Sequence, residues 1–132
     1  MGTPEQNAEV VRRGYEGFNT GDMGLLREVF HENVSWHTPG QSYLGGDYQG
    51  REATFGQFGR FVGDTGGSFK ALLQEVARSD DGRIVSIHRN TAERNGKQLD
   101  VRCCIVFEVE DGQIIDGREH FFDLYAWDEF WS

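Results

Sequence analysis

Residues 84–125, IVSIHRNTAERNGKQLDVRCCIVFEVEDGQIIDGREHFFDLY, decide the fold of this chain. Asn95-Gly96 separates two runs in which apolar and polar residues alternate, and Asp111-Gly112 follows the second run. Such pairs are typical of tight turns between antiparallel strands. The stretch therefore predicts three consecutive antiparallel strands over residues 84–94, 99–109 and 114–125.

Two further strands are predicted upstream of this stretch. Residues 68–78 have β-like composition and end at the turn signal Asp80-Asp81-Gly82. Residues 34–38 alternate and end at Pro39-Gly40, which predicts a short strand. Strands this long rarely stay flat, so we expect a curved sheet.

Three helices are predicted in the first half of the chain. Thr3-Pro4-Glu5-Gln6 has the pattern of a capping box, and apolar residues follow at helical spacing. Asp22 is a candidate N-cap for a second, short helix, and residues 51–61 form a third. The whole chain, residues 1–132, is therefore expected to be one α+β domain whose sheet curves around the first and third helices.

Composition narrows the function classes. Thirteen Lys and Arg residues against 22 Asp and Glu residues leave a net charge of −9, which argues against nucleic acid and anionic membranes as partners. The apolar stretches are too short to cross a bilayer, and the N-terminal residues do not resemble a signal peptide. Cys103 and Cys104 are adjacent and would point to opposite faces of a strand, so we expect no disulfide and a cytoplasmic location.

Several short motifs are more specific than the composition. They are Trp36-His37-Thr38-Pro39-Gly40, Leu44-Gly45, Tyr48-Gln49-Gly50-Arg51-Glu52, Asp111-Gly112-Gln113-Ile114 and Glu119-His120-Phe121-Phe122-Asp123. With the order of the predicted elements, these motifs resemble the SnoaL-like polyketide cyclase group of the nuclear transport factor 2-like and ketosteroid isomerase-like superfamily. The resemblance covers nearly the whole chain. It implies a cone-shaped fold with a pocket between the curved sheet and the helices.

The resemblance also implies a catalytic pair. SnoaL-like cyclases and the related limonene-epoxide hydrolases keep an acid near Asp123, and the hydrolases set an Arg beside it, which Arg89 matches. Those hydrolases carry a second Asp where this chain has Thr91, so their relay is incomplete here. An equal alternative is that Asp123 caps a C-terminal helix beginning near Ala126, or pairs with an Arg.

Strand alternation then selects the residues expected to face the pocket. An inward Asp123 places Phe121 and Glu119 on the same face, where Glu119 is a second acid, either coupled to Asp123 or paired with Arg89. The expected substrate-binding set combines aromatic walls with a few polar groups: Tyr15, Phe18, Trp36, Thr38, Phe58, Phe61, Thr91, Val101, Cys103, Glu119 and Phe121.

Neither a metal nor a cofactor is expected. The four histidines lack the HxH and HExxH spacings of metal sites, and the chain has neither a GxGxxG nor a Walker-type loop. The isomerase mechanism does not transfer, because Trp36 occupies the position of its carboxylate base.

Three functions remain open. The first is a cofactor-independent small-molecule enzyme that performs cyclisation, isomerisation or hydration on an apolar cyclic or polyketide-like substrate. The second is a noncatalytic binding module for a small apolar ligand, and the third is a structural homodimer. A homodimer is expected in any case, through an outward sheet face that carries His88, Asn90, Arg102, Cys104, Val106, His120 and Phe122.

Overall fold

The computed structural model describes residues 2–132 as four helices and six strands. The helices are α1 (Pro4–Thr20), α2 (Met23–Val29), α3 (Arg51–Gly63) and α4 (Leu124–Trp131). The strands are β1 (Phe30–Thr38), β2 (Gly46–Gln49), β3 (Lys70–Arg78), β4 (Ile84–Arg94), β5 (Lys97–Glu110) and β6 (Gln113–Phe121).

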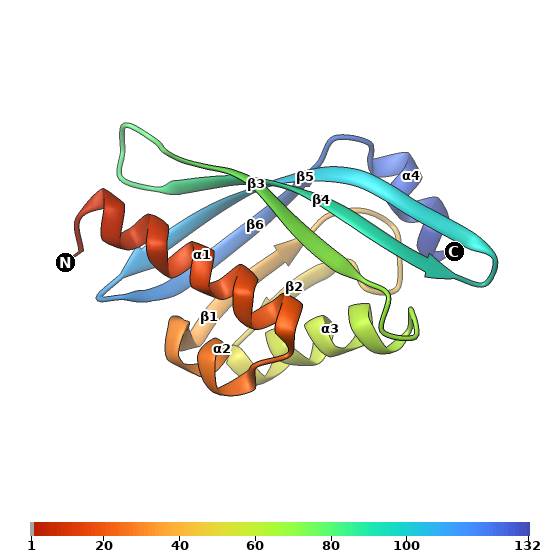
Figure 1. Cartoon of the computed structure of the whole chain (residues 1–132), viewed down its shortest axis with the longest axis horizontal. Helices are drawn as coiled ribbons and strands as arrows, with labels where there is room; N and C mark the ends of the chain where they lie inside the picture. Colours follow the sequence, from red (N-terminus) through yellow and green to blue (C-terminus); the bar gives the residue numbers. More distant parts are fainter. Residues whose placement is uncertain (1) are drawn as a thin grey trace.

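The strands form one sheet in the order β2-β1-β6-β5-β4-β3. All neighbours are antiparallel except β1 and β6, which run parallel, so the sheet is mixed. The sheet curves, and α1 and α3 lie on the same side of it (Figure 1). The expected α+β fold with a curved sheet around the N-terminal helices is confirmed.

Local sequence signals set the helix starts as expected. The Thr3 hydroxyl accepts a hydrogen bond from the backbone N–H of Gln6, and the Gln6 side chain accepts one from the backbone N–H of Thr3. These two bonds satisfy backbone donors that α1 itself leaves free. Asp22 caps α2 with a single hydrogen bond, which its carboxylate accepts from the backbone N–H of Leu25.

The tight turn at Asn95-Gly96 sets the register of β4 against β5. Both residues adopt left-handed backbone angles, with φ of 53° at Asn95 and 77° at Gly96, and Arg94 pairs directly with Lys97. The pairing then continues without a shift, so His88 lies opposite Cys103. Residues that pair directly across antiparallel strands share a face, and the inner face of β4 therefore carries Ser86, His88, Asn90 and Ala92.

This register corrects the expected orientation of β4. Arg89 and Thr91 lie on the outer face, whereas His88 and Asn90, which were expected on the outer face, are buried on the inner one. Glu93 is exposed and also lies on the outer face of β4.

Three features of the chain ends and edges were not expected. Residues 46–49 add β2 as an antiparallel edge strand, and β1 joins the sheet by pairing parallel to β6. The last strand ends at Phe121, four residues earlier than expected, and α4 starts at Leu124. Asp123 therefore lies between a strand and a helix, where strand alternation no longer applies.

Aromatic side chains fill the space between helices and sheet. The Trp36 ring packs edge-on against Phe30 and Phe58, with ring centroids 5.9 and 5.2 Å apart. It lies over Gly117 of β6, where a Cβ atom would overlap the ring. A glycine at this position therefore allows Trp36 to lie flat on the sheet. Among the described residues, no helix is long and apolar enough to span a membrane.

Candidate active site

A cavity of about 50 Å³ lies between the inner face of the sheet and helices α1 and α3. Its wall is mostly aromatic and aliphatic, and four lining residues carry polar side chains: Tyr15, His88, Asn90 and Glu119. The apolar lining residues are Val11, Gly14, Phe18, Phe30, Trp36, Phe58, Phe61, Phe69, Ala71, Ile105, Phe107 and Ile114. An apolar cleft with a few convergent polar groups is the usual form of a small-molecule site.

Glu119 on β6 is the acidic group of the cavity. Its side chain is 7% exposed, and burial raises the pKa of its carboxyl from 4.5 to about 7. One hydrogen bond opposes this shift, because the Thr38 hydroxyl donates to Glu119 Oε1 over 2.7 Å. A carboxyl group with a pKa near neutrality is half protonated at physiological pH, and it can both accept and release a proton.

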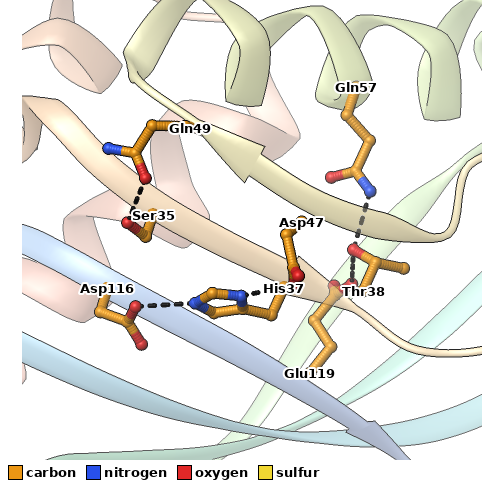
Figure 2. Close-up of polar contacts among 8 residues, drawn as sticks. All are labelled: Ser35, His37, Thr38, Asp47, Gln49, Gln57, Asp116 and Glu119. Carbon is orange, nitrogen blue, oxygen red and sulfur yellow. Dashed lines mark hydrogen bonds and ion pairs between the residues drawn. The ribbon is translucent and has the colours of Figure 1, made fainter.

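Gln57 on α3 directs that hydrogen bond. Its Nε2 donates to Thr38 Oγ1 over 2.7 Å (Figure 2). It also donates to the Leu44 carbonyl over 2.9 Å. The Thr38 oxygen thereby receives a donor, so its own hydrogen is directed to Glu119. Gln57 Oε1 is buried without a hydrogen-bond partner among residues 2–132. A buried polar atom without a partner lowers the stability of the fold. Such atoms are uncommon in proteins, and a functional role is one reason for their presence.

A second set of polar side chains lies in the same cavity wall, on α1 and β4. The Tyr15 hydroxyl from α1 is 2.7 Å from Ser86 Oγ and 2.6 Å from His88 Nδ1. His88 Nε2 is 2.9 Å from Asn90 Oδ1, and Asn90 Nδ2 donates to the Lys70 carbonyl. Asn90 therefore accepts from His88, which places the imidazole hydrogen on Nε2 and leaves Nδ1 to accept from Tyr15.

Burial keeps this Tyr15–His88–Asn90 chain uncharged. It lowers the pKa of His88 from 6.5 to about 4, against a smaller opposite effect of the Asn90 hydrogen bond. It also raises the pKa of Tyr15 well above its ordinary value of 10. The hydroxyl and the imidazole are thus neutral at pH 7, and they act as hydrogen-bonding groups rather than as acid and base.

The structure brings about half of the expected site residues to the cavity. Six of them line it: Tyr15, Phe18, Trp36, Phe58, Phe61 and Glu119. Thr38 is buried behind Glu119 as its hydrogen-bond donor. Val101 and Cys103 are buried on the inner face but do not belong to the cavity wall, and the pKa of the Cys103 thiol is raised by burial.

Phe121 and Thr91 also lie away from the cavity. The Phe121 ring stacks on Trp127 of α4, with centroids 3.9 Å apart, and therefore closes the end of the sheet. Thr91 is half-buried on the outer face of β4.

The catalytic positions expected for Asp123 and Arg89 are wrong, whereas the alternative that Asp123 caps the C-terminal helix is confirmed. Asp123 is exposed, and its carboxylate accepts a hydrogen bond from the backbone N–H of Ala126, so it is the N-cap of α4. Arg89 lies on the outer face, where its guanidinium binds Asp100 through two 2.7 Å hydrogen bonds. The register of β4 and the early end of β6 place these two side chains outside the cone.

Sequence reasoning missed Gln57, Ser86, His88 and Asn90. A signal for the last three was present, because a two-residue turn at Asn95-Gly96 pairs Cys103 with His88. An inward Cys103 therefore requires an inward His88. For Gln57 there was no comparable signal, since one glutamine on a helix indicates nothing by itself.

Metal-binding geometry is not found among the described residues: they contain no group of three or more His, Cys, Asp and Glu side chains placed to hold a metal ion. His37 on the outer face binds two carboxylates instead, with Nδ1 2.7 Å from Asp47 and Nε2 2.9 Å from Asp116 (Figure 2). Burial alone would lower the pKa of His37, but these two hydrogen bonds outweigh it, and the pKa is raised. This arrangement connects β2, β1 and β6.

Comparison with known proteins places the chain in a family. Residues 11–117 match the SnoaL-like domain, and the chain belongs to this family. The structure of Bal32a from a soil-derived mobile gene cassette is 69% identical, with a TM-score of 0.94 over 97% of this chain and 98% of that one.

Other relatives are more distant. The uncharacterized protein Rv0034 of Mycobacterium tuberculosis is 29% identical over 98% of this chain and 99% of its own length. A nuclear transport factor 2-like protein from Burkholderia xenovorans superposes with a TM-score of 0.80 at 17% identity, over 97% of each chain. This last likeness shows the shared cone fold.

Proposed function

We propose that this protein is a cofactor-independent enzyme that moves protons on a small apolar ring compound, with Glu119 as the acid/base. One observation carries the proposal: a buried carboxyl group with a pKa of about 7 lies in the wall of an otherwise mostly aromatic cavity. Burying a carboxyl group with one hydrogen bond costs free energy, and active sites are where such pKa shifts concentrate.

The geometry supports proton abstraction next to a carbonyl group. The Glu119 carboxylate takes the proton from carbon, and the electron pair moves onto the carbonyl oxygen. The neutral Tyr15 hydroxyl, whose hydrogen His88 Nδ1 accepts, can turn to donate to that oxygen. Return of the proton to another carbon gives isomerisation. Attack of the enolate carbon on a second carbonyl carbon of the same molecule gives cyclisation, and the oxygen of that carbonyl then takes the proton from Glu119.

Solvent exchange tests the proposal without knowledge of the natural substrate. The protein is incubated in D₂O with a panel of small cyclic ketones, and deuterium uptake is followed by mass spectrometry. We expect Glu119→Gln to lower the exchange rate by about 10²–10⁴-fold, the usual range for a lost acid or base. Asp123→Asn is the matched control, since it changes an exposed carboxylate to an amide. Exchange at the wild-type rate in Glu119→Gln would refute the role.

A noncatalytic ligand-binding module is the second candidate. His88 favours it, because its imidazole is too weakly basic to serve as a second acid/base group. Binding of ring compounds without deuterium uptake from any of them would support this candidate over the enzyme.

A homodimer and a cytoplasmic location are parts of the same proposal. The outer sheet face retains Arg102, Cys104, Val106, His120 and Phe122 of the expected interface. Phe122 is 53% exposed, with the Arg102 guanidinium 4.6 Å from its ring centre. Light scattering of the wild type and of Phe122→Glu tests the dimer, and a monomeric wild type at micromolar concentration would refute it. Two free cysteines support a reducing compartment.

A further inference from the structure

Both hydrogen-bond chains of the cavity present acceptor oxygens to a ligand. In the first chain, Tyr15 donates its hydroxyl hydrogen to His88 Nδ1, and His88 Nε2 donates to Asn90. Ser86 Oγ lies 2.7 Å from the Tyr15 hydroxyl, whose own hydrogen is already given to His88, so Ser86 donates to Tyr15. The Tyr15 oxygen therefore retains only a lone pair for a ligand.

Glu119 is the stronger of the two acceptors. Gln57 donates to Thr38, and Thr38 donates to Glu119 Oε1, so the second chain ends on this carboxyl group. Among the described lining residues there is neither Lys nor Arg, and His88 is uncharged at neutral pH. Buried charges in proteins are normally paired. The described part of the chain thus buries a carboxyl group without giving it a cationic partner.

Aromatic rings lie beside this carboxyl group. Trp36 covers Gly117, which precedes Glu119 by two residues on the same face of β6. The rings of Phe107 and Phe58 lie 5.9 and 5.2 Å from that of Trp36. Aromatic faces attract a cation that comes within about 6 Å of the ring centre, and Trp does so most strongly. The net charge of −9 also favours the approach of cations to the protein.

We propose that the cavity binds small alkyl amines as their ammonium ions, with an N–H group donating to the Glu119 carboxylate and the alkyl group packed against the aromatic wall. Removing an ammonium ion from water costs free energy, which the carboxylate and the rings offset. Such a ligand leaves both hydrogen-bond chains intact, whereas a ketone in the proposed reaction requires Tyr15 to turn away from His88. The inference does not rest on the proposed function, although a bound amine would compete with a ketone for Glu119.

The cavity limits the size and the charge of the ligand. About 50 Å³ accommodates only a few non-hydrogen atoms. Phe18 is half-buried, whereas the other described lining residues are buried, so Phe18 is the side chain that can turn outward and give the alkyl group room. Glu119 is the one acidic residue among the described lining residues, so we expect a single ammonium group and a short alkyl chain.

Titration with two compounds of matched shape tests the inference. Isopropylammonium and 2-propanol are added to the protein at pH 8, above the pKa of about 7 of Glu119, and binding is followed by NMR chemical shifts. We expect isopropylammonium to bind roughly tenfold more tightly, because a hydrogen bond to a charged partner is stronger than one between neutral groups.

Glu119→Gln and Asp123→Asn are the matched variants, since each changes one carboxylate to an amide. Glu119→Gln should weaken isopropylammonium binding by about tenfold or more, because the cation loses its counter-ion. Its affinity for 2-propanol should stay within about threefold of the wild-type value, which shows that the cavity persists. Asp123→Asn removes an exposed carboxylate and should keep the tenfold preference.

Several results would overturn the inference. These are equal binding of the two compounds by the wild type, tighter binding of 2-propanol, and no binding of isopropylammonium at millimolar concentration. Wild-type affinity for isopropylammonium in Glu119→Gln, or loss of the preference in Asp123→Asn, would place the cation elsewhere. The comparison of the two compounds needs only the wild type, so it does not depend on the folding of a variant. It involves no ketone and no turnover, so the proposed function is judged separately by deuterium exchange.

Discussion

Glu119→Gln should change how the stability of the protein depends on pH. The folded-state pKa of Glu119 is about 7 against 4.5 for an ordinary glutamate, so the folded protein holds this proton more tightly than the unfolded chain does. Its contribution to stability is therefore fully present below pH 4.5 and is lost as the pH rises through 7. Each pH unit of such a difference is worth about 1.4 kcal/mol, which gives a loss of roughly 3 kcal/mol.

Glutamine imitates the protonated acid. Its side-chain oxygen can still accept the hydrogen bond from Thr38, but it carries no titrating group. Wild type and Glu119→Gln should thus have similar stability at pH 4.5. At pH 8 the variant should be more stable by roughly 3 kcal/mol, or about 10 °C in Tm for a chain of this length.

Urea denaturation of both proteins at intervals between pH 4.5 and 8 measures this difference. The difference between the two proteins is the informative quantity, because His88 titrates in the opposite direction and masks the effect in the wild type alone. Asp123→Asn controls for the loss of one negative charge elsewhere. If the stability difference between wild type and Glu119→Gln stayed constant across this pH range, Glu119 would not be a buried acid with a raised pKa.

Four further predictions concern neighbouring residues. His88 contributes stability that is present above pH 6.5 and is lost as the pH falls through about 4. His88→Gln should therefore abolish roughly 3 kcal/mol of the stability that the wild type loses in acid, as measured by denaturation. If the variant lost as much stability in acid as the wild type, His88 would not be buried as a neutral group. Thr38→Val removes the hydrogen bond that lowers the pKa of Glu119, so carboxyl-carbon NMR should show that pKa rising, and a fall would be inconsistent with the geometry. Asp123→Ala should lower the unfolding free energy by about 1 kcal/mol, because it removes the cap of α4. Asp123→Asn retains a capping side chain and should lower it little. A large loss of deuterium exchange in either variant would restore a catalytic role for this residue. Phe18 is the one half-buried residue among the described residues of the cavity wall, so Phe18→Ala should open the cavity and speed association of ring compounds in stopped-flow mixing. An unchanged rate would place the entrance elsewhere.

The sequence predicted the local structure well where local chemistry decides it. The capping box at Thr3, the N-cap at Asp22 and the turn at Asn95-Gly96 are all confirmed, because each depends on side chains and backbone within a few residues. The inward faces of β1 and β5 also follow from alternation of apolar and polar residues. The α+β cone follows from these elements together with the family resemblance.

Orientation errors arose where long-range pairing was decisive. Arg89 was placed inward from a family pattern, although the tight turn at Asn95-Gly96 pairs it with Arg102 and puts His88 on the cavity side. Asp123 was placed by extending the alternation of β6 two residues past its end. A one-residue change in register turns every side chain of a strand to the other face, so these errors changed the identity of the site.

The sequence by itself determined most of the elements, their caps and turns, and the acid Glu119 as a candidate, but not the edge strand β2 or the end of β6. Only the tertiary structure decided which polar groups share the cavity. Gln57, Thr38 and Glu119 come from three elements that meet through the parallel pairing of β1 with β6, and Tyr15 meets His88 across 73 positions of the chain. Enclosure by helices and sheet then raises the pKa of Glu119 and lowers that of His88, because removal of water penalises the charged form of each group, and burial of this kind exists only in the folded chain.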